Sequence, residues 1–128
     1  MNKINEITQN IIGAAIEIHR AIGPGLLESS YELCLEKEFK LREIPYQRQL
    51  KIPLSYKGLE LDYTYRIDFL VANRVVVEVK AVDILMPVHH AQLLSYLKLG
   101  NWKTGLLINF HVPVLSMGIK RIVWGFDR

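Results

Sequence analysis

The sequence predicts a single α/β domain, residues 1–128, in which helices flank a mixed β-sheet, and two periodicities point to this fold class. In some segments apolar residues recur every three or four positions, which is the period of an amphipathic helix. In others apolar and polar residues alternate, which is the period of a half-buried strand. With 128 residues, half of them hydrophobic, the chain is long enough for one core and too short for two.

Three helices are expected from the recurrence of apolar residues every three or four positions. Apolar residues from Ile4 to Ile22 fall on one helix face, and Gly23-Pro24-Gly25 ends this helix because proline lacks an amide donor. A second helix runs from about Leu26 to Arg42 and is closed by Ile44-Pro45. Pro87 suits the first turn of a third helix, which continues to Lys98.

Five strands are expected from the alternation of apolar and polar residues. In the longest, Leu61, Tyr63, Tyr65, Ile67 and Phe69 should face one way, and Asp62, Thr64, Arg66 and Asp68 the other. Pro53 predicts an edge position or a bulge in the strand before it. The strands are predicted at Gln47–Tyr56, Leu61–Val71, Val75–Lys80, Thr104–Phe110 and Ile119–Phe126.

The segment Ala72-Asn73-Arg74 looks like a hairpin loop, and its length decides which side chains share a face. In an antiparallel pair, directly opposite residues point to the same side of the sheet. A loop of three residues pairs Val71 with Val75 and places Asp68 opposite Glu78, whereas a loop of two would separate the carboxylates. A shared site therefore predicts the three-residue loop, or a bulge with the same effect.

Asp68, Glu78 and Lys80 are the strongest candidates for chemistry, because they interrupt segments that are otherwise apolar. Mg²⁺ or Mn²⁺ prefers oxygen ligands, and two carboxylates leave positions free for water and a phosphate oxygen. Lys80 shares the face of Glu78 and could hold the attacking water or neutralise developing charge. The alternative interpretation is a solvated strand face that carries an ordinary Glu–Lys pair.

Two further pairs lie at helical spacing. Glu28 and Tyr31 share a face of the second helix, where an acid in the first turn also favours the positive helix end. Gln92 and Tyr96 share a face of the third helix and could reach a phosphate, a base or the lysine. For the second pair the alternative interpretation is an ordinary helix surface above a leucine-rich core.

Composition narrows the class of protein. The net charge of +3 permits a polyanionic partner without requiring one. Cys34 is the one cysteine, so an internal disulfide and a cysteine-rich zinc site are excluded, and it reads as a small core residue. No segment resembles a membrane span or a signal peptide, so we expect a soluble, cytoplasmic protein.

The motif Gly25-x-x-Glu28-x-x-Tyr31 resembles the signature of the GxxExxY protein family, which is grouped with the PD-(D/E)XK nuclease superfamily. That superfamily has a restriction-endonuclease-like fold. The resemblance covers nearly the whole chain and includes Ala15-x-x-x-His19, Gly23-Pro24-Gly25, Tyr56-Lys57-Gly58, Asp68, Glu78-Val79-Lys80-Ala81, Ala91 to Leu97 and Gly105 to Phe110.

The resemblance implies a role for each matching residue. Asp68 matches the metal-binding Asp of the superfamily, and Glu78 and Lys80 match its (D/E)-x-K. Glu28 matches the acidic residue that the first core helix often places near the metal. Gln92 and Tyr96 look like the Gln-x-x-x-Tyr motif of RecB-type nucleases. One departure is Ile67, where the name of the superfamily would place proline.

The resulting hypothesis is a hydrolase, a nuclease that depends on Mg²⁺ or Mn²⁺ and acts on nucleic acid, with DNA favoured over RNA. Glu28, Asp68, Glu78 and Lys80 are the predicted catalytic residues, and the first three are the predicted metal ligands, Glu28 directly or through water. The predicted substrate contacts are Gln92, Tyr96, Tyr31 and Arg66, although a strand-face salt bridge explains Arg66 equally well.

Two alternatives stay open at this point. One is a non-catalytic nucleic-acid-binding or assembly module that keeps the nuclease fold, which the small net charge favours. The other is cleavage of RNA. Exposed aromatic residues on the strand Leu61–Val71 could also form the face of a homodimer.

Overall fold

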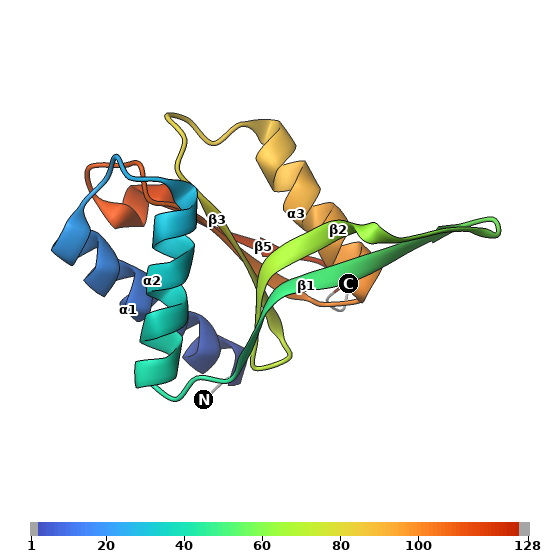
Figure 1. Ribbon diagram of the computed structural model, residues 1–128, viewed down its shortest axis with the longest axis horizontal. Coiled ribbons are helices and arrows are strands. Elements are labelled where there is room, and N and C mark those ends of the chain that lie inside the picture. Colours follow the sequence, from blue (N-terminus) through green and yellow to red (C-terminus); the bar gives the residue numbers. More distant parts are fainter. Residues whose placement is uncertain (1–2, 126–128) are drawn as a thin grey trace.

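The computed structural model describes residues 3–125, apart from the side chains of residues 62–64. It confirms a single small α/β unit with the predicted order of helix, helix, three strands, helix and two strands (Figure 1). The elements are α1 (Lys3–Ile22), α2 (Glu28–Leu41), β1 (Tyr46–Tyr56), β2 (Leu59–Val71), β3 (Val75–Lys80), α3 (Pro87–Gly100), β4 (Thr104–Asn109) and β5 (Ile119–Val123). A short 3₁₀ helix, Leu115–Gly118, precedes β5.

The sheet is mixed, as predicted, and its five strands follow the order β1-β2-β3-β4-β5. Strands β3 and β4 are parallel and are joined through α3, while every other neighbouring pair is antiparallel. Figure 1 shows α1 and α2 on one side of the sheet and α3 on the other. The carboxyl ends of β3 and β4 therefore meet at one edge, with helices on both sides of it.

Each face of the sheet has its own core. The first core lies under α1 and α2, where Ile11, Leu35 and Phe39 are fully buried against the valines of β3. These residues follow the helical period of the sequence, so hydrophobic burial fixes both helices on this face. Cys34 packs at the margin of the first core, which confirms its interpretation as a small core residue.

The second core lies under α3 and is built from Leu93, Tyr96 and Leu97 of this helix with apolar residues of β1, β2 and β4. Successive residues of β3 thus enter different cores: Val77 enters the first and Val76 the second. A strand buried on both faces explains why β3 reads as a continuous apolar run in the sequence.

The loop between β2 and β3 confirms the predicted register. Val71 pairs with Val75 across the three residues 72–74. Ala72 and Asn73 hold left-handed backbone conformations, with φ of 53° and 58°. Two consecutive residues in this region turn the chain tightly enough to bring the strands back side by side.

The alternation predicted for β2 is wrong at its central point. Ile67 enters the second core, but Phe69 enters the first, although the two residues should face the same way. On the neighbouring strand Gln49 adopts a φ of 53°, and the regular pairing is interrupted between the Arg48–Phe69 and Leu50–Ile67 pairs. The pair of strands β1 and β2 makes a local half-turn at this point, so side chains of the same parity lie on opposite faces before and after it.

Beyond this half-turn, residues 50–67 of β1 and β2 form a two-stranded arm that projects from the body of the protein (Figure 1). Its tip is a two-residue turn, Lys57-Gly58, in which both residues have positive φ. The register shifts between Ile52 and Leu54, which confirms the irregularity predicted from Pro53.

Among residues 3–125 no helix combines the length and the apolar character needed to cross a membrane.

The hydroxyl of Thr104 is a buried polar group, and its effect on the stability of the protein can be tested. Thr104 is fully buried at the start of β4, and its Oγ1 has no hydrogen-bond partner among the described residues. Replacing it with valine removes an unsatisfied hydroxyl, so Thr104→Val should leave the free energy of unfolding unchanged or raise it by about 1 kcal/mol.

Urea unfolding measures this difference, with Thr8→Val as the control. Thr8 Oγ1 donates to the Asn5 carbonyl at 3.1 Å and accepts from Arg121 at 3.4 Å, so its loss should cost about 1 kcal/mol. A clear destabilisation by Thr104→Val would show that the Thr104 hydroxyl has a partner.

Candidate active site

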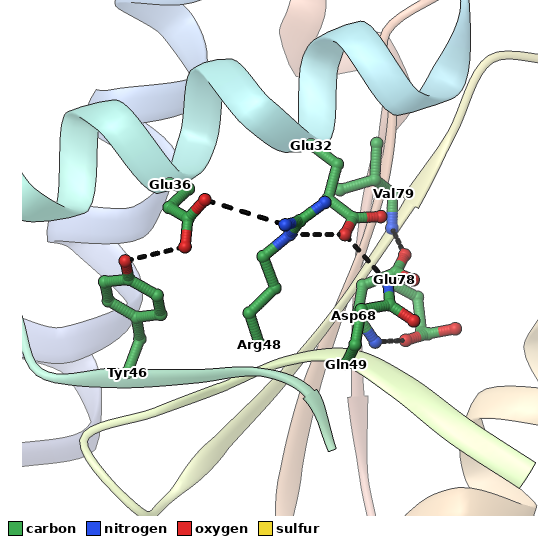
Figure 2. A network of polar contacts seen from close by, with 8 residues as sticks. All are labelled: Glu32, Glu36, Tyr46, Arg48, Gln49, Asp68, Glu78 and Val79. Carbon is green, nitrogen blue, oxygen red and sulfur yellow. Dashed lines mark hydrogen bonds and ion pairs between the residues drawn. The ribbon is translucent and has the colours of Figure 1, made fainter. Parts of the chain in front are cut away.

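The candidate site lies where β2 and β3 separate. Their regular pairing extends from Val71–Val75 to Phe69–Val77, one residue short of Asp68 and Glu78. Beyond that point the backbone N–H of Asp68 donates to Glu78 Oε2 at 2.6 Å, and the N–H of Val79 donates to Asp68 Oδ2 at 2.8 Å (Figure 2). Each carboxylate therefore replaces a carbonyl that the sheet would otherwise supply to the opposite strand.

The two carboxyl groups are held where charge is unfavourable. Glu78 is only 5% exposed, and burial, followed by the neighbouring Asp68 carboxylate, raises its pKa to about 8. Burial also raises the pKa of Asp68, to about 6, with the hydrogen bond from Val79 opposing and the charge of Glu32 adding to the rise. A buried and a half-buried acid that repel each other make a place where a cation is favoured.

On the α2 side, the acid that reaches this pair is Glu32. Gln49 Nε2 donates to Glu32 Oε2 at 2.8 Å and to Asp68 Oδ1 at 3.3 Å, and so bridges the helix to the site (Figure 2). Arg48 Nε donates to the same Glu32 oxygen at 2.7 Å. The left-handed backbone of Gln49 places two successive side chains of β1 on one carboxylate, which regular alternation would forbid.

The network continues along α2. The guanidinium of Arg48 lies 3.6 Å from Glu36 Oε1, and the Tyr46 hydroxyl donates to Glu36 Oε2 at 2.9 Å. Glu32 and Glu36 both point from α2 toward β1 in Figure 2. Arg48 is thus shared by two carboxylates, and this arrangement fixes α2 against the strand that carries Gln49.

Glu28, the predicted acid of α2, lies at the first residue of the helix and is exposed. It takes no part in the hydrogen-bonded network, although its charge raises the pKa of both Asp68 and Glu78 and it therefore lies near them. The sequence does contain a signal for Glu32 and Glu36. They follow Glu28 at steps of four residues, and such spacing places all three acids along one helix face.

On the α3 side, Gln92 and Tyr96 line one groove, as their spacing predicted. The groove has a volume of about 440 Å³ and is also lined by Tyr65 and Leu54 of the arm. Gln92 is exposed, while Tyr96 is mostly buried. Burial raises the pKa of the Tyr96 phenol, and the charge of Glu78 adds to the rise. Tyr96 therefore lies near Glu78, although neither acid of the pair lines the groove itself.

Lys80 is half-buried at the end of β3, two residues after Glu78. Its charge lowers the pKa of both acids and thus opposes the rise caused by their burial. The Lys80 carbonyl accepts the N–H of Phe110 at 2.9 Å, so the end of β3 is fixed to the end of β4.

Asn109, which the sequence reasoning assigned no role, holds the segment that follows Lys80. This buried side chain accepts the N–H of Val82 at 3.0 Å and donates to the Val82 carbonyl at 2.8 Å. It also accepts the N–H of His111 at 3.2 Å. A polar residue at the end of an apolar strand was the available signal, because the carboxyl edge of parallel strands is where sites form.

The substrate contact predicted for Tyr31 is not supported. Tyr31 is fully buried and stacks on Phe110, with ring centroids 4.4 Å apart. Its hydroxyl donates to the Gly23 carbonyl at 2.5 Å and accepts the N–H of Leu26 at 3.2 Å. The tyrosine of the Gly-x-x-Glu-x-x-Tyr motif thus fixes the Gly-Pro-Gly loop before α2, and the motif positions the helix.

Arg66 is exposed on the arm, and its expected relation to Asp68 is changed by the half-turn between them. Ile67 enters the core under α3, so Arg66 points to the opposite face of the arm. No ion pair joins Arg66 to a carboxylate whose side chain is described, so the alternative of a strand-face salt bridge finds no support.

The donor set fits a small divalent cation. Asp68 and Glu78 contribute oxygen atoms from two strands, and each carboxylate uses only one oxygen for the opposite backbone. Within the part of the chain that the structure describes, no three His, Cys, Asp or Glu side chains cluster as metal ligands. Direct ligation by Glu28 therefore has no support. Mg²⁺ commonly binds through one or two carboxylates and keeps several waters.

An α/β domain with a split strand pair, an Asp and a Glu-x-Lys at the split is the architecture of a restriction-endonuclease-like protein. A family model described as the PD-(D/E)XK nuclease superfamily matches residues 5–122. The chain belongs to this superfamily. Neither a curated protein nor a solved structure matches the chain significantly.

The raised pKa values predict how stability depends on pH. A carboxyl whose pKa is higher in the folded than in the unfolded protein binds extra protons in the fold, so its contribution to stability is lost as pH rises. For Glu78 this window runs from 4.5 to about 8. In metal-free buffer the free energy of unfolding should fall by up to about 1.4 kcal/mol per pH unit for each such group.

Thermal unfolding from pH 5 to pH 8 checks this. Glu78→Gln keeps an acceptor for the Asp68 N–H without a titrating group, so its melting temperature should fall less with pH than that of the wild type. Glu6→Gln, at an exposed position on α1, is the control and should follow the wild type. Parallel profiles for Glu78→Gln and the wild type would contradict the assigned environment of Glu78.

Proposed function

We propose that this protein is a divalent-metal-dependent nuclease that hydrolyses phosphodiester bonds, with DNA as the substrate. The observation that carries the proposal is the pair of the half-buried Asp68 and the buried Glu78, hydrogen-bonded across the split between β2 and β3, with Lys80 close enough to lower the pKa of both. Membership of the PD-(D/E)XK nuclease superfamily supports nuclease activity. The Gly25, Glu28 and Tyr31 motif further supports placement in the GxxExxY group.

In this proposal Asp68 and Glu78 hold Mg²⁺ or Mn²⁺ through the carboxylate oxygens that face away from the backbone. The bound ion would lower the pKa of a water molecule and stabilise negative charge on the phosphate. Lys80 orients the attacking water or neutralises charge on the phosphate oxygens. Glu28 contacts the ion through water, because it lies near both acids without joining them.

The residues around the acid pair position it and the substrate. Gln49 donates to Asp68 Oδ1 and thereby limits rotation of this carboxylate. Glu32 holds Gln49 in turn, and Arg48 balances the charge of Glu32. Such support matters because a metal site requires its first ligands to be held in a narrow range of orientations.

The groove lined by Gln92 and Tyr96 supports their role in substrate binding. Its volume of about 440 Å³ falls within the range of ligand pockets, and its walls combine two tyrosines with the polar ends of Gln92 and Lys98. An amphipathic ligand with an aromatic base and a charged backbone suits such a lining.

The aromatic residues predicted to form a homodimer face do not support it where their side chains are described, because Phe69 is buried and Tyr65 lines the groove. A homodimer is still part of the proposal, and it is supported by Tyr56 and Leu59, which are exposed at the tip of the arm.

One observation favours a second candidate, a non-catalytic module that keeps the nuclease fold. Asp68 and Glu78 each accept a backbone N–H, so they already serve the sheet without a metal. In such a module the acids would complete the strand edges, and the groove would bind a partner without cleaving it. The two candidates differ in metal binding and in turnover.

Cleavage assays with purified protein test the proposed function. The wild type should cleave labelled DNA in Mg²⁺ or Mn²⁺ and lose activity in EDTA. Glu78→Gln and Lys80→Met should each lower the rate by about 100-fold or more, because each removes a group that acts on the reacting phosphate. Running single-stranded DNA, duplex DNA and RNA in parallel identifies the substrate.

The matched controls are Glu6→Gln and Lys37→Met, which make the same changes at exposed helical positions outside the hydrogen-bonded network of the site. They should retain wild-type activity. Equal activity in the wild type, Glu78→Gln and Lys80→Met would point to a contaminating nuclease and reject the proposal. Metal binding without cleavage of any substrate would favour the non-catalytic module.

A further inference from the structure

Two positive charges face each other on the arm. Lys51 and Arg66 are direct partners in the antiparallel pairing of β1 and β2, so their side chains leave the same face of the arm side by side. Both residues are exposed. Like charges placed directly opposite each other in a sheet destabilise it, so the pair needs a reason beyond folding.

No carboxylate of the described side chains forms an ion pair with either residue. The contrast with Arg48 on the same strand is clear, because Arg48 is held between Glu32 and Glu36. Asp68, the acid two residues after Arg66, accepts from Val79 and Gln49 instead. Among the described side chains, therefore, no carboxylate neutralises the two cations.

Along the strands the pair is close to the acid site, on the other side of the half-turn at Gln49. Lys51 is two residues beyond Gln49 on β1, and Arg66 is two residues before Asp68 on β2. Two residues of strand span about 7 Å, which is close to the axial distance between phosphates two nucleotides apart in one strand of DNA, about 7 Å. The opposite face of the arm is apolar and carries Ile52 and Ile67 into the core under α3.

We propose that Lys51 and Arg66 form a phosphate-binding pair, which grips the backbone of the nucleic acid next to the phosphate at the acid site. This inference rests on the proposed function. The guanidinium can bind a phosphate through two parallel hydrogen bonds, while the lysine ammonium acts as a point charge. Such contacts set the position and register of a strand without reading its sequence. A protein with a net charge of only +3 can thereby concentrate attraction where it is needed.

The test combines binding and stability in one double variant, Lys51→Gln with Arg66→Gln. Binding of a labelled DNA duplex is measured by fluorescence anisotropy over a range of salt concentrations, in EDTA to prevent metal-dependent cleavage. Loss of two phosphate contacts should weaken binding and reduce the slope of log K against log salt by about 2. The melting temperature should stay the same or rise, because a repulsive pair has been removed.

The control is Lys37→Gln with Lys120→Gln, which removes the same charge from exposed positions on α2 and β5. It should retain most of the wild-type slope. The exchange variant Lys51→Arg with Arg66→Lys keeps both charges, so it should bind DNA with the wild-type slope. It also provides a second measurement if the glutamine variant folds poorly.

A wild-type slope in the double glutamine variant, or an equal reduction in the control, would overturn the proposal. So would a marked fall in melting temperature of the double glutamine variant, because it would show that the pair serves the fold. If the wild type binds no DNA at any salt concentration in EDTA, this inference fails, and the cleavage assay in Mg²⁺ or Mn²⁺ decides the proposed function separately. If the wild type binds and cleaves DNA while the double variant binds equally well, only the phosphate-binding pair is rejected.

Discussion

The separation of β2 from β3 beyond the Phe69–Val77 pair is the constraint on which the rest of the site depends. Where two strands part inside a protein, their free N–H groups must find other acceptors. Asp68 and Glu78 supply those acceptors, and in doing so they are drawn together inside an apolar sheet. The same hydrogen bonds that complete the sheet thus hold two carboxylates close together, where burial and mutual repulsion raise their pKa values.

The helices on the two sides of the sheet contribute different groups to the surroundings of the acid pair. On one side, α2 presents Glu32, which is held by Arg48 and linked to Asp68 through Gln49. On the other side, α3 presents Tyr96 at the wall of a groove. The residues facing the acid pair therefore add negative charge from α2 and a polar, aromatic lining from α3. A small hard cation and a phosphodiester are the partners that this combination favours.

The sequence was sufficient to predict the order of the elements and the three-residue loop, because period and parity are rigid consequences of backbone geometry. It could not predict the half-turn at Gln49, because glutamine rarely adopts a positive φ and nothing local requires one here. The roles of Glu32 and Tyr31 were missed for a related reason. The helix α2 carries four acids and two aromatic residues, and tertiary contacts decide which of them reach the site and which pack in the core.

The central claim, that Asp68 and Glu78 form a metal site, is tested most directly by a crystal structure of the protein soaked in Mn²⁺. An anomalous difference map should show one Mn²⁺ between the two carboxylates, with an oxygen of each at about 2.0–2.3 Å. The ion should be absent from crystals of an Asp68→Asn variant grown and soaked in the same way. A map without a peak at this position, with both carboxylates in the same hydrogen bonds as before the soak, would contradict the account.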